Sequence, residues 1–305
     1  MTIMTAHGAG NTFVVLVDPD GTRRLSDELA RVLCDPDGPL AVSGRGADGA
    51  IRVAPAEDGR SDVVMDHRNA DGSLAEMCGN GVRVVARVAL DQRLVDPTVE
   101  EVTVLSLAGP RPVRIVRDRE GGFLAAAVSM GAPRRDPADV GFSASWARTD
   151  MGGRWHLEDV PVGFDVVSMG NPHAVVAVDD LAAAPLESLG RDLQSHPAFE
   201  AGVNVGFVRL EDPATVRLRV LERGVGETAA CGTGACAAVA TLRDRGLVDA
   251  EVAVHLPGGV LTVRDLDGEL ELEGPAEITE VLRTDDARLV GIAALVADGW
   301  GPGAG

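Results

Sequence analysis

The stretch Cys78-Gly79-Asn80-Gly81 leads into the apolar run 82–86, and the stretch Cys231-Gly232-Thr233-Gly234 leads in the same way into 235–239. Each combines a cysteine, a glycine-rich turn and the start of a buried helix. A thiol at a helix N-terminus is acidified by the exposed backbone amides and the helix dipole, and the same amides can hold a carboxylate. The two stretches therefore predict a pair of acidified thiols that act as acid and base.

The two cysteines lie about half a chain length apart, and the similarity between the halves extends beyond them. The stretch 10–15 resembles 170–175, and 107–110 resembles 256–259, in each case before a β-rich run. Three matched landmarks in the same order indicate a duplicated domain. An approximate two-fold axis between the copies would make the thiol loops face each other across the domain interface, a common location for a ligand cleft.

The spacing of apolar residues predicts a mixed secondary structure. The predicted strands are 13–17, 102–105, 113–116, 205–208 and 216–220, and the predicted helices are 26–33, 81–90, 181–191 and 234–245. We therefore expect an α+β fold of two pseudo-symmetric domains, each a curved mixed or antiparallel, barrel-like sheet around a central helix, with the active site in the cleft between them. The N-terminal domain is predicted to span 1–130, joined by 275–305, and the C-terminal domain 131–274.

Charge and cysteine content exclude several classes of partner. The 305 residues carry a net charge of −19 and no long basic stretch, which argues against nucleic acid and anionic membranes. No apolar run reaches the ~18 residues of a membrane span, and we expect a cytoplasmic protein. Four cysteines without paired Cys-x-x-Cys spacing predict neither a disulfide scaffold nor a metal site. Cys34 and Cys236 are expected to be small apolar core residues.

Lysine is absent from the chain, so all 28 basic residues are arginines. A protein without lysine cannot hold pyridoxal phosphate as an internal Schiff base, and it cannot form a Walker P-loop. Amino-acid chemistry in this protein is therefore expected to need no cofactor.

Seven motifs, in the same order, resemble those of the diaminopimelate epimerases over nearly the whole chain. They are 7–11 (HGAGN), 46–49 (GADG), 68–73 (RNADGS), 77–83 (MCGNGVR), 170–173 (GNPH), 203–205 (VNV) and 222–228 (ERGVGET) with 231–234 (CGTG). The resemblance implies an isomerase that interconverts LL- and meso-diaminopimelate on the route to lysine and peptidoglycan. It also implies a small-molecule substrate and a possible homodimer.

Inversion at a carbon atom requires a base on one face and an acid on the other, because a single residue that returns its own proton tends to restore the starting configuration. The resemblance implies that Cys78 deprotonates the L centre and Cys231 the D centre. The reacting carboxylate would be held by backbone amides at the two helix starts, which are those of Gly79, Asn80, Gly232 and Thr233.

The resemblance also implies how the rest of the substrate is held. The distal carboxylate would contact a set of polar side chains, which are Asn69, Asn171, Asn204 and Arg223. Glu222 would meet ammonium groups, Asn11 would meet the reacting α-amine, and His173 would orient or tune a catalytic cysteine.

Several positions depart from the family pattern, among them Thr12, Leu221 and Gly49, and Gly49 stands where some members of the family have a glutamine that contacts the substrate amine. Three alternatives therefore stay open. They are an isomerase of the same fold that acts on another amino acid, a thiol redox protein with a bond between Cys78 and Cys231, and a non-catalytic binding module. The glycines and asparagines could also serve only turns, and the remaining histidines His67, His156, His196 and His255 are expected to be structural.

Overall fold

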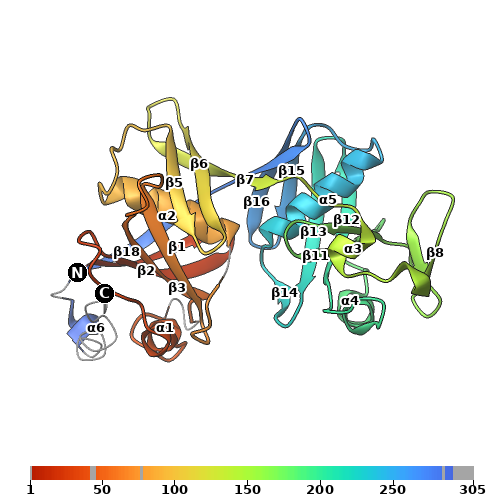
Figure 1. The fold of residues 1–305 in the computed structure, drawn as a ribbon, viewed down its shortest axis with the longest axis horizontal. Coiled ribbons are helices and arrows are strands. Elements are labelled where there is room, and N and C mark those ends of the chain that lie inside the picture. The colour runs from red at the N-terminus through yellow and green to blue at the C-terminus, as the bar shows by residue number, and fades with distance from the viewer. Residues whose placement is uncertain (1, 42–45, 76–77, 284–285, 291–305) are drawn as a thin grey trace. The chain divides into compact units, whose positions relative to one another are not determined.

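The computed structural model describes residues 2–41, 46–75, 78–283 and 286–290. Contacts between residues divide the chain into two compact units (Figure 1). The first contains Met1–Val128 and Gly274–Gly305, and the second contains Ser129–Glu273. The predicted return segment 275–305 includes residues 284–285 and 291–305, which lie outside the described residues.

The first unit is a sheet that curves around one helix, α2 (Gly79–Asp91). Its strands, in spatial order, are β18 (Glu277–Arg283), β1 (Thr2–Gly8), β2 (Asn11–Val17), β3 (Gly49–Pro55), β4 (Val63–Asn69), β5 (Glu101–Ser106), β6 (Gly109–Arg117) and β7 (Phe123–Gly131). The pairs β2–β3 and β4–β5 are parallel and the other pairs are antiparallel. Helix α2 contacts six of these strands, while α1 (Asp27–Cys34) packs on β2, β3 and β4.

The second unit repeats this plan around α5 (Gly232–Asp244). Its strands, in spatial order, are β10 (Asp165–Ser168), β11 (Pro172–Ala177), β12 (Asn204–Asp212), β13 (Thr215–Glu222), β15 (Glu251–Leu256), β16 (Gly259–Leu266) and β17 (Glu269–Gly274). The pairs β11–β12 and β13–β15 are parallel, as are their counterparts in the first unit. The unit also contains α3 (Pro137–Val140), the 3-10 turn Ala144–Trp146, β8 (Ala147–Thr149), β9 (Trp155–Leu157), α4 (Leu186–Ser195) and β14 (Gly226–Thr228).

Each central helix is surrounded by sheet, which explains its composition. Residues 235–242 of α5 are all buried, and the helix is built from Ala, Val, Cys, Thr and Leu there. A helix that is buried on every side is apolar on every side. Helix α2 departs from this rule at two buried residues, Asn80 in its first turn and the fully buried Arg83 within its run of valines.

The predicted α+β fold of two similar units is confirmed, and the five predicted strands all lie inside observed ones. The predicted helix 181–191 is wrong in its first turn, because α4 begins only at Leu186. Pro185 lacks a backbone N–H and disfavours a helical conformation at the residue before it, so the helix starts after the proline. Among the described residues, no helix is both long enough and apolar enough to cross a membrane.

Candidate active site

The Cys78 loop of the first unit caps the N-terminus of α2. Cys78 has an extended backbone, with φ −140° and ψ 106°, and its Sγ accepts a hydrogen bond from the amide of Gly81 at 3.4 Å. A Cβ atom built on Gly81 would lie 3.6 Å from this sulfur and 3.3 Å from Cδ1 of Ile51. A side chain at this position would therefore be tight against Ile51, although it would only be in ordinary contact with the sulfur.

The Cys231 loop of the second unit has the same geometry. Cys231 caps α5 with φ −131° and ψ 109°, and its Sγ accepts from the amide of Gly234, also at 3.4 Å. A Cβ atom on Gly234 would lie 3.2 Å from the sulfur and 3.0 Å from Cγ2 of Val220. The alternative that these glycines serve only turns is wrong, since they lie in the first turns of two 13-residue helices.

Both central helices begin two residues earlier than predicted, at Gly79 and Gly232. Glycine and asparagine have low helix propensity, which hides a first turn in the sequence. This difference places Gly79 and Asn80, like Gly232 and Thr233, inside the first helical turn. Backbone amides in a first turn have no partner within the helix, so they are available to an anion.

The two sulfurs differ in burial. Cys78 is half-buried, whereas Cys231 is only 5% exposed. The pKa of the Cys231 thiol is raised to about 12, mainly by burial and then by the carboxylate of Glu222, while hydrogen bonds from Thr233 and Gly234 oppose the rise. The prediction of an acidified thiol is therefore wrong for Cys231, because loss of hydration outweighs the helix start.

A chain of polar groups leads to Cys231 within the second unit. Nε2 of the buried His173 lies 3.0 Å from Oδ1 of Asn171, and Nδ2 of Asn171 donates to Oγ1 of Thr233 at 3.3 Å. Thr233 Oγ1 lies 3.5 Å from the sulfur. Burial lowers the pKa of His173 to about 3, so its imidazole is neutral. Because an amide oxygen only accepts, the Nε2 of His173 carries the proton and fixes the direction of the chain.

A different chain lies beside Cys78 in the first unit. Nη2 of Arg83 donates to Oδ1 of Asn80 at 2.6 Å, and Nδ2 of Asn80 donates to Oδ1 of Asn11 at 2.5 Å. Asn80 and Arg83 are 3% and 0% exposed. The sequence analysis did not select Arg83, although an arginine within the run Val82–Ala86 was a visible signal.

Three predicted residues meet at the ends of β12 and β13. Asn204 is buried; its Nδ2 donates to the carbonyl of Pro172 at 3.1 Å, and its Oδ1 accepts from the amide of Arg223 at 2.9 Å. Asn204 therefore holds the backbone beside Glu222 and Arg223. Nη1 of the exposed Arg223 donates to the carbonyl of Ala201 at 2.6 Å, which orients the guanidinium.

Glu222, at the end of β13, accepts a hydrogen bond from Oγ1 of Thr228 at 2.5 Å. Thr228 lies on β14, which pairs with β13. The sequence analysis included Thr228 in a motif but assigned it no contact. The hydrogen bond keeps the Glu222 carboxylate near Cys231.

Asn69 lies at the end of β4, the strand that corresponds to β13, and it is exposed. Its Nδ2 donates to Oγ of Ser73 at 3.0 Å, and its neighbour across the strands is Gly49. A Cβ atom on Gly49 would lie 2.6 Å from Nε2 of the buried His67. The imidazole of His67 therefore leaves no room for a side chain at position 49, which accounts for one departure from the family pattern.

Each unit by itself brings part of the predicted set together. In the first unit Asn11, Gly79 and Asn80 adjoin Cys78, while Asn69 ends a strand of the same sheet. In the second unit the predicted residues cluster around Cys231 and the end of β13, namely His173, Asn171, Thr233, Gly232, Glu222, Arg223 and Asn204.

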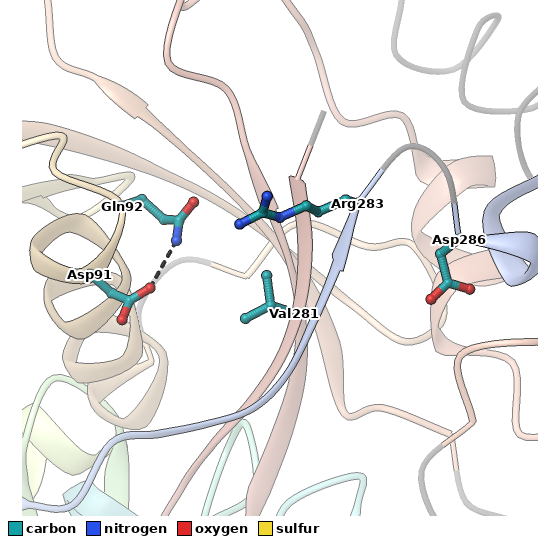
Figure 2. A pocket seen from close by; sticks show the side chains of 5 residues that line it. All are labelled: Asp91, Gln92, Val281, Arg283 and Asp286. Carbon is teal, nitrogen blue, oxygen red and sulfur yellow. Dashed lines mark hydrogen bonds between the residues drawn. The ribbon is translucent and has the colours of Figure 1, made fainter.

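A cavity of the first unit lies away from the Cys78 loop. Figure 2 shows this cavity of about 570 Å³ in the first unit, lined by Asp91, Gln92, Val281, Arg283 and Asp286. Gln92 Nε2 donates to Asp91 Oδ2 at 2.8 Å. These two residues adjoin the C-terminal end of α2, about 20 Å from its N-terminal cysteine at 1.5 Å per residue. The cavity contains none of the predicted site residues.

Solved structures of other proteins share this fold. A phenazine biosynthesis protein of the PhzF family from Bacillus anthracis has a similar structure, with a TM-score of 0.65, 16% identity, and coverage of 92% of this chain and 98% of that one. A hydroxyproline epimerase from Agrobacterium vitis gives a TM-score of 0.60 at 19% identity, covering 92% and 90%. The chain therefore has the two-unit α+β fold of these two proteins.

Sequence comparison then identifies the family. Residues 3–135 and 165–279 match the model of the family described as diaminopimelate epimerase. The diaminopimelate epimerase of Alkalilimnicola ehrlichii is 41% identical over 89% of this chain and 94% of its own length, and that of Xanthomonas euvesicatoria is 43% identical over 88% and 91%. The chain belongs to the diaminopimelate epimerase family, which is a family of isomerases.

Proposed function

We propose that this protein interconverts LL- and meso-diaminopimelate without a cofactor, with Cys78 and Cys231 as base and acid. One observation carries the proposal: two cysteines in separate units cap helices of equal length and accept from a glycine amide at the same distance of 3.4 Å. Membership of the diaminopimelate epimerase family supports the choice of substrate.

In the proposed reaction the thiolate of Cys78 removes the α-proton of the L centre. The C–H bond breaks, an S–H bond forms, and the electron pair passes into the adjacent carboxylate as an enolate-like state. The Cys231 thiol then gives its proton to the opposite face of the same carbon and becomes a thiolate. No group is oxidised or reduced, and the return reaction exchanges the two roles.

The protonation of Cys231 supports this assignment. Its pKa of about 12 keeps the thiol protonated at neutral pH, as the acid of the forward reaction must be. In the return reaction Cys231 must act as a thiolate. An ammonium group of the substrate beside Glu222 would offset the carboxylate that raises the pKa of Cys231, so substrate binding prepares the thiol to release its proton.

Carboxylate binding supplies the remaining stabilisation. The first-turn amides of Gly79, Asn80, Gly232 and Thr233 are proposed to bind the reacting carboxylate, where preorganised donors contribute about 2.7–4 kcal/mol each. Asn69, Asn171, Asn204 and Arg223 are proposed to recognise the distal carboxylate. Glu222 is proposed to bind ammonium, Asn11 to bind the reacting amine, and His173 to orient the Cys231 side through Asn171.

We further propose that residues 1–130 with 275–305, and residues 131–274, are the two epimerase domains, and that the substrate binds between their thiol loops. A cytoplasmic location and a homodimer belong to the same proposal. Light scattering of the purified protein tests the dimer, with a mass of twice 31.6 kDa as the expected result.

The direct test offers the purified protein several amino acids in deuterated water. LL-diaminopimelate should gain deuterium at the inverted centre, while L-proline and trans-4-hydroxy-L-proline should not. Exchange into one of the other amino acids alone would favour a same-fold isomerase with another substrate. Fast thiol–disulfide exchange without any epimerisation would favour the redox alternative.

A further inference from the structure

Arg83 is the largest fully buried side chain of the described residues and lies outside the set predicted from the sequence. It stands five residues after Cys78 in α2, and its guanidinium donates through Nη2 to Oδ1 of Asn80 at 2.6 Å. A buried guanidinium is costly unless it forms hydrogen bonds. Its presence among the buried valines of α2 therefore requires a reason within the structure.

The polarity of the hydrogen bonds gives that reason. A guanidinium only donates, so the group of Asn80 that faces Arg83 is its carbonyl oxygen. The Nδ2 group of Asn80 must then point the other way, where it donates to Oδ1 of Asn11 at 2.5 Å. Arg83 thus fixes the orientation of the side-chain amide of Asn80 and, through it, that of Asn11. The result is that Asn11 turns its carbonyl oxygen, and not its NH₂ group, towards the Cys78 loop.

The orientation of Asn11 matters for a substrate that carries ammonium groups. The Oδ1 atom has a second lone pair, which can accept from an ammonium, whereas an NH₂ group in the same place would repel it. Resting on the function proposed above, we propose that Arg83 is a positioning residue. It holds Asn80 and, through it, Asn11 in the orientation that accepts the α-ammonium group of the substrate beside Cys78.

The second unit provides a matched comparison. Cys236 stands five residues after Cys231, in the place that Arg83 has in α2. In that unit the amide of Asn171 is oriented from a strand, by His173 of β11. Two units with the same backbone therefore fix an asparagine by different means, and Cys236→Ala is a control for a change at this helix position.

Three variants test the proposal. Arg83→Met keeps the length of the side chain and removes every donor, whereas Arg83→Lys keeps a donor. Asn80→Asp keeps the acceptor for Arg83 and removes the donor to Asn11. We expect Arg83→Met and Asn80→Asp to raise KM for LL-diaminopimelate by about 10- to 100-fold, the usual effect of losing a hydrogen bond to a charged group. Arg83→Lys should recover most of this loss, and Cys236→Ala should leave KM unchanged.

A second measurement does not depend on activity. In ¹H–¹⁵N spectra of the wild-type protein, the side-chain NH₂ of Asn80 should exchange slowly with solvent, because it is buried and bonded to Asn11. Arg83→Met should make this exchange at least about tenfold faster, and Arg83→Lys should restore it. If the wild-type protein does not epimerise diaminopimelate, the proposed function fails, while the exchange measurement still decides the role of Arg83.

An unchanged exchange rate in Arg83→Met would overturn the proposal, as would an unchanged KM in both Arg83→Met and Asn80→Asp. If Arg83→Met does not fold, Asn80→Asp and Arg83→Lys carry the test. A KM for Asn80→Asp within about twofold of the wild-type value would then overturn the proposal.

Discussion

The Cys78 loop and the Cys231 loop share one backbone geometry and differ in their polar surroundings. Both sulfurs accept from a glycine amide at 3.4 Å at the start of a 13-residue helix. Cys231 is buried beside the Glu222 carboxylate, whereas Cys78 is half-buried beside the chain from Arg83 to Asn11. A repeated backbone thus supplies two thiols of similar geometry, which differ in their burial and in their polar neighbours.

The largest expected effect comes from removing either sulfur. Cys78→Ala and Cys231→Ala should each lower kcat for epimerisation by about 10³-fold or more, since general acid and base groups contribute about 10²- to 10⁴-fold. Polarimetry or chiral chromatography of the products measures the rate. Cys34→Ala is the control, because this cysteine is buried in a core cluster of the first unit that contains no residue of either thiol loop. Full activity in either variant would contradict the two-thiol account.

Removing the negative charge of Glu222 should change the pKa of Cys231 in the second unit. Glu222→Gln should lower the pKa of Cys231 from about 12, although not to its ordinary value, because burial is the larger cause. The pH dependence of Cys231 alkylation, followed by mass spectrometry, measures this shift. The same variant should reduce kcat/KM by about 10- to 100-fold through the lost ammonium contact.

Asn69→Asp is the matched variant in the first unit, because Asn69 ends β4 as Glu222 ends β13. It should leave Cys231 alkylation unchanged. An alkylation profile of Cys231 that does not move in Glu222→Gln would mean that the carboxylate does not control this thiol.

Breaking the hydrogen-bond chain that runs from His173 through Asn171 and Thr233 to Cys231 should have a smaller effect on the rate. Thr233→Val removes the hydroxyl that lies 3.5 Å from the sulfur and whose hydrogen bond lowers the pKa of this thiol. The pKa of Cys231 should therefore rise further, and kcat should fall by about three- to tenfold, as expected for one neutral hydrogen bond. Rates for both substrate directions measure the change. Equal or higher kcat in both directions would exclude a role for the hydroxyl.

The smallest expected effect is on the stability of the fold. It comes from His67, a histidine of the first unit that has no part in the proposed reaction. His67 is buried, neither ring nitrogen has a hydrogen-bond partner among the described residues, and burial lowers its pKa to about 4. A lowered pKa in the folded state means that its contribution is present above about pH 6.5 and is lost as the pH falls towards 4. At about 1.4 kcal/mol per pKa unit, the loss approaches 3 kcal/mol.

His67→Val places in the first unit the residue that Val220 provides at the corresponding position of the second. Urea unfolding at pH 7 and pH 4.5 should show a weaker loss of stability on acidification in this variant than in the wild-type protein. An identical loss in both proteins would show that His67 does not titrate in this range. His173→Asn would then be tested in the same way for the loss of stability on acidification, since burial lowers the pKa of His173 to about 3.

The sequence was sufficient for the fold because its repeated landmarks are local. Cysteine, glycines and an apolar run specify a helix start, and valine-rich runs specify the five predicted strands, whereas the order of the strands in the sheets was not predicted. The start of α4 was wrong because the pattern Leu181–Arg191 is amphipathic across Pro185, and the proline decides where the helix begins.

Burial and hydrogen-bond direction limited the prediction of the site. The pKa of Cys231 depends on how completely the folded unit excludes water, which no spacing reveals. The role of Arg83 depends on which atom of Asn80 faces it. The lack of room for a side chain at Gly49 depends on the strand register, which pairs Gly49 with Asn69 and His67 with Ile51.

Deuterium incorporation during the first turnovers tests the central claim most directly. With LL-diaminopimelate in deuterated water, the account predicts that the meso product carries one solvent deuterium at the inverted carbon, while the recovered LL substrate keeps its hydrogen. This follows because Cys78 returns the proton it removed, whereas Cys231 delivers one from solvent. A meso product that keeps the original hydrogen, or LL substrate that gains deuterium as fast as product forms, would contradict two thiols acting from opposite faces.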